Sequence, residues 1–344
     1  MKILYGVQAT GNGHFLRSNI IIKELRKKGH NVSIIFSGGD KNSRSRINTL
    51  YPDFKPYTYF NGLTFSTDKG KIKYLKTVKD AKLINMYKDI KSFDNEQFDL
   101  VITDFEPISS RIAKRKEIPS IGIGHQYAFI FDIPKYKKNP IANTVLRYFA
   151  PADYNVGLHW NHFDQPVLPP IINKINIYGK KEIKNKILVY LPWEDNNEVQ
   201  DFLSCKREYD FHVYSNIDAD YEKDNVYWHP FSRKKFLEDL VTSSGVISNA
   251  GFEFPSEVLS IGKRLLVKPQ IGQTEQLSNA EALKRLDLAT TMDYLDKDTL
   301  KKWVDSKKNN LEHFIYDVAP IVNWIVNMKW DNIDELMNKY WNNN

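Results

Sequence analysis

The sequence contains one cysteine, Cys205, among its 344 residues. A single thiol excludes an intrachain disulfide framework and any metal cluster held by several thiolates. The sequence also lacks a run of about 18 apolar residues, so no segment is expected to span a bilayer. The first residues, MKILYGVQATGNGH, turn polar too soon for a secretory signal. We therefore expect a cytoplasmic protein.

Several motifs of catalysis and ligand binding are absent as well. There is no G-x-S-x-G elbow for acyl chemistry. The loop TGNGHFLRS is not a P-loop, and Leu16 stands where a dinucleotide fingerprint needs its third glycine. His159 and His162 in HWNH lack a third metal ligand at a convincing spacing, and Asp218 and Asp220 are typical of a solvated turn. We expect no metal and no cofactor.

The composition indicates a folded protein of two domains. Hydrophobic residues make up 42% and charged residues 26% of the chain, which is typical of soluble globular proteins. The net charge of +7 favours an anionic partner, such as a nucleotide, an acidic lipid surface or nucleic acid. The lysine-rich stretches that begin at Lys69 and Lys135 are read first as solvated surface. Peripheral contact with an anionic membrane is the second interpretation, and nucleic acid is not the expected partner.

Alternating strand and helix patterns predict two Rossmann-like domains that face each other across a cleft. KILYGVQA, a glycine loop, a helical segment and NVSIIFSGG open the first domain, which we place at residues 1–163. Residues 164–186 contain three prolines in their first half and are read as a linker. A second domain is expected at 187–320. The tail at 321–344 is expected to form helices that could return to the first domain.

Polar residues after the strands of the first domain form a candidate catalytic site. His14 follows the loop of Gly11 and Gly13, and a neutral imidazole there could take a proton from a hydroxyl. Asp104 ends the run VITD and could orient that imidazole, although it could equally cap the helix after Pro107. Further residues on the same side are expected to bind the acceptor: Gly11, Gly13, Glu106, His125 and Gln126.

The stretch NAGFEFPSEVLSIG carries the strongest signal. We expect a helix started by Pro255, whose free amides and neighbouring Gly251 would suit a diphosphate. Glu257 could accept hydrogen bonds from a ribose diol, or it could simply complement the helix dipole. Glu275 and Gln276 pair an acceptor with an amide, which suits the hydroxyls of a sugar.

The segment SNAGFEFPSEVLSIGKRLLVKPQIGQTEQLSNA, with GNGH and GHQY, resembles the GT-B nucleotide-sugar glycosyltransferases. The chain is similar to the peptidoglycan N-acetylglucosaminyltransferase that forms lipid II and to the UDP-glycosyltransferases. It is closer still to an uncharacterised bacterial and archaeal branch with VYLPWED and HPFSR. The resemblance implies His14 as the base and Asp104 as its partner. It also implies donor-binding residues in the second domain: Ser248, Asn249, Gly251, Phe252, Glu257, Gln273, Glu275 and Gln276.

The function implied is inverting, metal-independent transfer of a hexose or N-acetylhexosamine. The donor would be a UDP-sugar and the acceptor a cell-envelope glycan or a lipid-linked molecule. The chain departs from the family by having YLPWED instead of a GGS phosphate loop, and the base contact is placed only near Phe231 and Ser232. A UDP-sugar 2-epimerase-like enzyme and a non-catalytic sugar- or nucleotide-binding protein are the alternatives.

Overall fold

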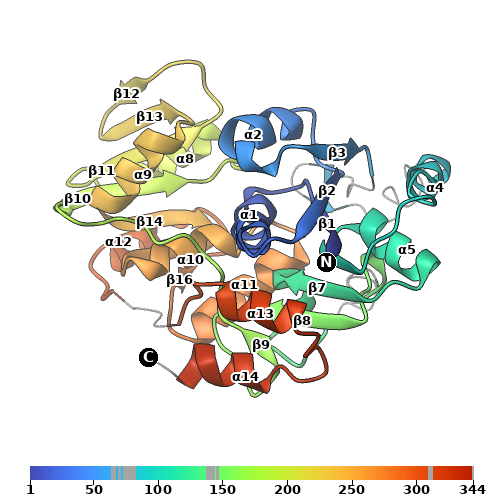
Figure 1. Cartoon of the computed structure of the whole chain (residues 1–344). Helices are drawn as coiled ribbons and strands as arrows, with labels where there is room; N and C mark the ends of the chain where they lie inside the picture. The colour runs from blue at the N-terminus through green and yellow to red at the C-terminus, as the bar shows by residue number, and fades with distance from the viewer. Residues whose placement is uncertain are drawn as a thin grey trace.

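Two seven-stranded sheets form the framework of the protein (Figure 1). The computed structural model describes residues 1–62, 67–68, 71–72, 83–136, 144, 147–308 and 313–342. All strands of the first sheet run parallel. Their order is β3 (Tyr57–Phe60), β2 (Asn31–Ser37), β1 (Lys2–Gln8), β6 (Leu100–Asp104), β7 (Ser120–Gly124), β8 (Tyr154–Leu158) and β9 (Val167–Leu168).

The second sheet repeats this plan with one reversed edge strand. Its strands run parallel except β12, which pairs antiparallel with β13. Their order is β12 (Tyr221–Lys223), β13 (Val226–Pro230), β11 (Asp210–Ser215), β10 (Ile183–Tyr190), β14 (Ser243–Asn249), β15 (Arg264–Lys268) and β16 (Thr290–Thr291). In a separate two-stranded sheet, β4 (Thr67–Asp68) pairs antiparallel with β5 (Lys71–Ile72). The α/β class with two facing Rossmann-like sheets is confirmed.

Helices connect the strands and cover the sheets. Those of the N-terminal part are α1 (Asn12–Lys27), α2 (Ser43–Leu50), the 3₁₀ turn η1 (Pro52–Phe54), α4 (Leu83–Lys91), α5 (Pro107–Lys116) and α6 (His125–Ala128). Those that follow are α8 (Asn196–Leu203), α9 (Arg233–Thr242), α10 (Glu253–Ser260), α11 (Thr274–Arg285), α12 (Lys297–Trp303), α13 (Ala319–Val326), α14 (Asp334–Met337) and the π-helical turn η2 (Asn338–Asn342).

Burial on both faces explains the parallel sheets. Almost every residue of β1 and β14 is buried, which is expected when helices cover both sides of a strand. In the first sheet, Tyr5 and Val7 pack in the same core as α1, whereas Leu4 packs in the same core as α5. The main core cluster continues from this first face into the second sheet, through residues such as Phe252. The two sheets therefore share one apolar interior where they meet.

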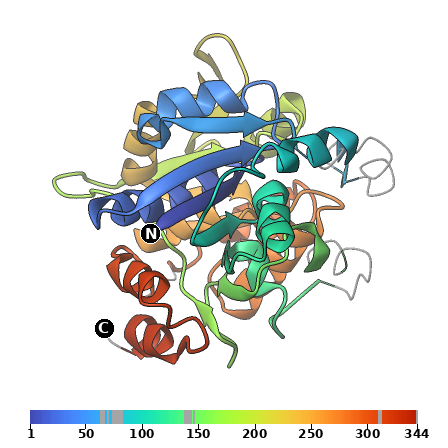
Figure 2. The ribbon, with the colours of Figure 1, turned by 45° about the vertical axis from the view of Figure 1, so that its right-hand side comes forward.

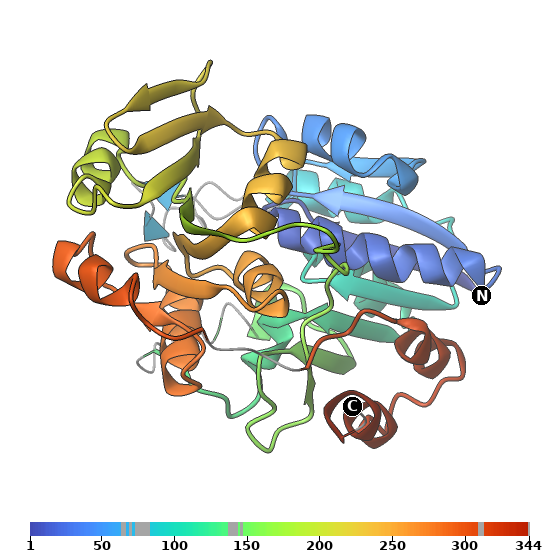
Figure 3. The same cartoon turned by 90° about the vertical axis from the view of Figure 1, so that its left-hand side faces the viewer.

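The C-terminal helices lie against the first sheet rather than the second (Figures 2 and 3). Helix α13 contacts α1, and α14 contacts β9. The Trp341 indole donates a hydrogen bond to the Val167 carbonyl at 2.8 Å. Strand β9 of the first sheet lies inside residues 164–186, and β10 already begins at Ile183, so the expected linker contributes strands to both sheets. The domain limits themselves stay a prediction.

Two further expectations concern membranes and helix starts. Within the described ranges, no helix is long and apolar enough to cross a membrane. Most of the lysine-rich stretch from Lys69 and part of that from Lys135 lie outside the described residues.

Helix α10 begins at Glu253, two residues before the predicted start at Pro255. Pro255 is the third helical residue, so its missing N–H removes one of the free amides expected at this helix end.

The topology places the loops that matter for function. Each sheet has a switch point from which the following parallel strands are added in opposite directions, between β1 and β6 in the first sheet and between β10 and β14 in the second. Open α/β sheets bind ligands outside the carboxyl ends of the strands at such switch points. The first switch point is flanked by the start of α1 and the end of β6, and the second by the loops after β10 and β14.

Candidate active site

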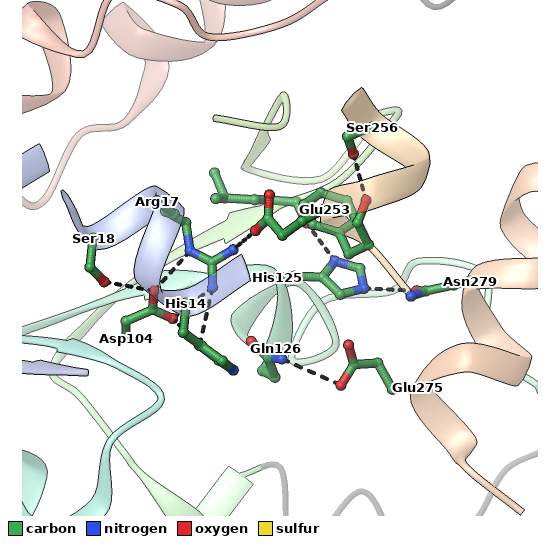
Figure 4. A network of polar contacts seen from close by, with 12 residues as sticks. His14, Arg17, Ser18, Asp104, His125, Gln126, Glu253, Ser256, Glu275 and Asn279 are labelled. Carbon is green, nitrogen blue, oxygen red and sulfur yellow. Dashed lines mark hydrogen bonds and ion pairs between the residues drawn. The ribbon is translucent and has the colours of Figure 1, made fainter. Parts of the chain in front are cut away.

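The structure brings His14 and Asp104 together at the first switch point (Figure 4). His14 is the third residue of α1, and Asp104 is the last residue of β6, which pairs with β1. The His14 Nδ1 atom lies 2.8 Å from Asp104 Oδ1. Among the described residues Nε2 of His14 has no hydrogen-bond partner. A neutral imidazole held in this way presents its second nitrogen as a proton acceptor.

Asp104 is held by more groups than His14 alone. Arg17 donates from Nη2 to Oδ1 at 2.7 Å and from Nε to Oδ2 at 3.0 Å, and Ser18 donates to Oδ2 at 3.0 Å. Burial alone would raise the pKa of this fully buried carboxyl, but the Arg17 charge and the contacts with His14 outweigh burial and lower it. Asp104 therefore stays ionised and fixed, and it does not cap α5.

A residue of the other domain reaches this group. Glu253, the first residue of α10, forms an ion pair with Arg17 Nη1. Its side chain crosses the start of α1, where a Cβ on Gly13 would overlap Glu253 Cγ. Gly13 is thus explained by close approach of Glu253. Gly11 has extended backbone that any residue can adopt, and nothing described lies within 4 Å of a Cβ placed there, so neither its backbone nor its surroundings require glycine.

Three predicted binding residues have structural partners instead. Glu106 is the N-cap of α5, accepts from the amides of Ile108 and Ser109 at 2.8 and 2.6 Å, and is fully buried. His125 stacks on Phe252 with centroids 3.9 Å apart. Both ring nitrogens of His125 are also engaged in hydrogen bonds, and burial lowers its pKa. Glu106, His125 and Phe252 thus have partners within the protein, and their expected contacts with the acceptor and the donor stay predictions.

Polar contacts also join the two domains around the candidate site. His125 Nε2 lies 2.7 Å from Asn279 Oδ1, and Gln126 donates to Glu275 at 3.3 Å. The Trp160 indole donates to Ser256 at 2.8 Å. Residues of the predicted acceptor side and donor side are therefore in direct contact, as Figure 4 shows for Gln126 and Glu275.

The predicted donor residues gather at the carboxyl ends of β14 and β15. Asn249 ends β14, and its amide donates to the Lys268 carbonyl at 3.0 Å. Its Oδ1 is buried without a hydrogen-bond partner among the described residues. A Cβ on Gly251 would meet no described atom within 4 Å. This corner of the second sheet has an unused acceptor and open space beside the backbone.

The remaining residues predicted to bind the sugar donor differ in how many of their polar atoms already have a hydrogen-bond partner in the protein. Glu257 is buried and receives a hydrogen bond from Arg233 at 3.0 Å. The Gln276 side-chain oxygen accepts a hydrogen bond from the backbone N–H of Gln270 at 2.8 Å. The buried Ser248 hydroxyl donates to the backbone carbonyl of Asn249 at 3.0 Å. Gln273 precedes α11 and has an unpartnered Oε1 among the described residues.

Aromatic and charged side chains follow neighbouring strands of the same edge. Phe231 and Ser232, the candidates for the base contact, are exposed after β13. Trp193 is exposed after β10, beside Glu194, which binds the buried ammonium of Lys268 at 2.7 Å. The loop YLPWED is thus anchored next to Asn249.

One group of described residues has donor atoms close enough for a metal. His212, His229 and Asp239 lie within 4.8 Å of one another, on β11, β13 and α9. Two lysines already neutralise this group, since Lys186 lies 2.6 Å from Asp239 and Lys235 lies 3.0 Å from His229 Nδ1. Ammonium groups in these positions oppose a second cation, so we assign no metal to it.

Arg17 and Glu253 are the residues that motif reasoning missed. Arg17 stands three residues after His14, a spacing that places both on one face of a helix. Glu253 lies inside the stretch that carries the strongest signal. Their pairing joins positions 236 residues apart, and no local pattern encodes such a contact.

Comparisons with known proteins agree with this geometry. A family model described as Glycosyl transferase family 1 matches residues 1–307. No curated protein matches the sequence.

Several solved structures are similar in fold. The glycosyltransferase SnogD from Streptomyces nogalater is 13% identical, with a TM-score of 0.57 over 97% of this chain and 96% of its own. The spinosyn forosaminyltransferase SpnP is 12% identical, with a TM-score of 0.61 over 95% and 99%. SsfS6 from Streptomyces sp. SF2575, complexed with thymidine diphosphate, is 13% identical, with a TM-score of 0.59 over 89% and 91%. The fold is the GT-B fold that the sequence predicted.

Proposed function

The chain belongs to glycosyl transferase family 1, and we propose that it moves a hexose or N-acetylhexosamine from a UDP-sugar to an acceptor hydroxyl with inversion and without a metal ion. The observation that carries the proposal is the pair of His14 and Asp104 on one domain, which lies beside the contact of Gln126 with Glu275, a predicted donor residue of the other (Figure 4). The proposed base and the proposed sugar-binding carboxylate therefore lie on the two sides of one contact between the domains (Figure 4).

The chemistry follows from the geometry of the base. An acceptor oxygen attacks the anomeric carbon while His14 Nε2 takes the hydroxyl proton, because Nδ1 is engaged by Asp104. The bond from the anomeric carbon to the phosphate oxygen breaks, and its electron pair leaves with the nucleoside diphosphate. Asp104 holds the ring orientation and stabilises the imidazolium that forms. A single displacement of this kind inverts the anomeric centre.

The donor would lie along the carboxyl ends of β14 and β15. The open backbone at Gly251 and the first free amides of α10 would receive the diphosphate. Glu257 would accept hydrogen bonds from the ribose, and Glu275 with Gln276 from the sugar. SsfS6 was solved with thymidine diphosphate, so a thymidine nucleotide is the first competitor to test against a uridine nucleotide.

The acceptor belongs to the N-terminal domain in this proposal. We place a cell-envelope glycan or a lipid-linked acceptor there, because the chain is basic overall, at +7, and carries lysine-rich stretches in this half. The same positive charge would favour peripheral contact of the protein with the anionic inner face of the membrane. Binding to vesicles with and without anionic phospholipid, compared at low and high salt, tests it separately.

The decisive experiment is a binding and turnover screen with nucleotide sugars. The purified protein is titrated calorimetrically with UDP-, dTDP- and GDP-sugars, and nucleotide release is followed with and without acceptors. We expect one UDP-sugar to bind, and Glu257→Ala to weaken that binding about tenfold or more, since it removes a hydrogen-bonded carboxylate. Glu281→Gln, which changes an exposed carboxylate of α11, is the matched control.

Other outcomes would change the assignment. If no UDP-sugar binds and Glu257→Ala alters the affinity for no nucleotide, the proposed donor site is wrong. Conversion of a UDP-sugar to its 2-epimer without any acceptor would indicate the epimerase-like alternative. Binding without transfer or release under any condition would indicate a non-catalytic sugar- or nucleotide-binding protein.

A further inference from the structure

Glu253 is the charged residue that α10 contributes to the base site of the opposite domain. Its carboxylate pairs with Arg17, and the same guanidinium holds both oxygens of Asp104. Asp104 in turn holds His14. Figure 4 shows this series of contacts, which runs from Glu253 of α10 through Arg17 and Asp104 to His14 of α1.

The fit around Glu253 is built into the N-terminal domain. The side chain passes over Gly13, where any Cβ would overlap it. Arg17 is almost fully buried beneath this contact. The start of α1 is therefore shaped to receive this one carboxyl group, although the two elements are far apart in sequence.

Charge counting shows what the contact does. Arg17 and Asp104 cancel each other, so a proton on His14 would leave the buried group with one net positive charge. An ionised Glu253 removes that excess. In a site shielded from water, a countercharge at this distance is worth more than it would be at the surface.

We propose that Glu253 is a positioning residue that supplies, from the opposite domain, the countercharge for the proton that His14 takes up. It acts through Arg17 and Asp104 and does not contact the reacting atoms. The proposal rests on the proposed transferase function for its kinetic test. It identifies a residue that neither the motif nor the comparisons assign.

The groups around Glu253 determine the pH range in which its carboxylate is charged. Burial raises the pKa of Glu253 to about 8, against the opposing effect of Arg17. Charged and titratable groups face it from every neighbouring element: Arg17 of α1, Asp104 of β6, Glu257 of α10, Glu275 of α11 and Tyr51 after α2. A folded pKa raised to about 8 means that Glu253 is half ionised near pH 8, is mostly protonated at pH 6.5 and supplies its full countercharge only from about pH 9 upward.

The test compares the wild-type protein with Glu253→Gln, which keeps the shape and can still accept from Arg17. We expect kcat of the variant to be close to wild type at pH 6.5 and about tenfold lower at pH 9, with the KM for the donor not raised. A merely structural role would lower activity by the same factor at every pH. Glu281→Gln is the control and should follow the wild-type profile.

A second readout needs no turnover. The His14 imidazole signals, followed by NMR with labelled histidine, should show a step near pH 8 in the wild type that Glu253→Gln lacks. If the step is unchanged in the variant, the proposal is wrong whatever the activity. If the step is lost but the wild type transfers no sugar, the coupling stands and the proposed function fails.

Discussion

The surroundings of Asp104 and the carboxyl ends of β14 and β15 differ in how completely their polar groups are paired. Asp104 on the N-terminal side receives hydrogen bonds from His14, Arg17 and Ser18. On the C-terminal side, the buried Oδ1 of Asn249 and Oε1 of Gln273 have no partner among the described residues. Buried polar atoms are rarely left unpaired, so each exception calls for an explanation.

This difference suggests a division of labour. Asp104 and the Nδ1 side of His14 are held in place before any substrate arrives, which is what a base needs if it is to avoid reorganisation during the reaction. On the C-terminal side, the unpaired oxygens of Asn249 and Gln273 can accept hydrogen bonds from the hydroxyls of a ligand. We therefore expect changes on the first side to affect catalysis and stability, and changes on the second side to affect donor affinity.

His14→Ala should have the largest effect. Loss of a general base typically costs about 10²–10⁴ in kcat, while donor affinity should stay unchanged because the donor residues lie on the other domain. Single-turnover transfer and calorimetry separate the two quantities. His162→Gln, which changes a partly exposed imidazole near the C-terminal helices, is the control. A loss of donor affinity in His14→Ala equal to the loss in rate would remove the proposed division.

Asp104→Asn should cost stability as well as activity. Breaking a buried ion pair typically destabilises by about 3–5 kcal/mol, because Arg17 is left without its main countercharge. The pKa of Asp104 is lowered in the folded state, so its contribution is present above pH 4 and is lost as pH falls through the lowered pKa.

Urea unfolding from pH 8 to pH 3 checks this prediction. The difference between wild type and Asp104→Asn should stay constant down to about pH 4 and shrink below it. Asp164→Asn removes an exposed carboxylate and should change little. A difference that grows towards low pH would contradict the assignment of Asp104 as the ionised partner.

Asn249→Ala should weaken the donor and leave the fold intact. The side chain gives up its amide bond to Lys268, and the ligand loses the free Oδ1 acceptor. One such hydrogen bond is worth about 1 kcal/mol, so we expect roughly five- to tenfold weaker nucleotide binding in calorimetry. Unchanged affinity together with a large loss of stability would show that Asn249 is structural.

Gly13→Ala should have the smallest effect and can be tested by a double-mutant cycle. The added methyl group would press on Glu253, at a cost of about 1 kcal/mol in a well-packed site. Glu253→Ala should relieve that cost, which makes the two changes non-additive in unfolding free energy. Strict additivity would mean that Glu253 does not pass over Gly13 in solution.

The sequence predicted the strands and their ends well for a physical reason. Buried parallel strands such as β1 and β14 appear as short apolar runs, and polar residues such as His14 and Asp104 follow them at the edge where ligands bind. Neighbouring strands of one sheet bring these residues together, so a topology guess was enough to pair His14 with Asp104.

Some residue types have more than one role, and for these the expected ligand contacts stay predictions. Glu106 and His125 look like ligand-binding groups after a strand, but Glu106 caps a helix and His125 packs on Phe252. Sequence pattern cannot distinguish a polar side chain that faces a ligand from one that satisfies its own backbone. The contact of Arg17 with Glu253 joins two domains, and only the three-dimensional structure shows it.

The most direct test is a crystal structure of the protein with a uridine diphosphate sugar. We predict that the diphosphate lies beside Gly251 and the start of α10, that Glu257 holds the ribose, and that the anomeric carbon faces His14 Nε2. A nucleotide bound at the glycine loop of α1, with Asn249 and Glu257 untouched, would contradict the account.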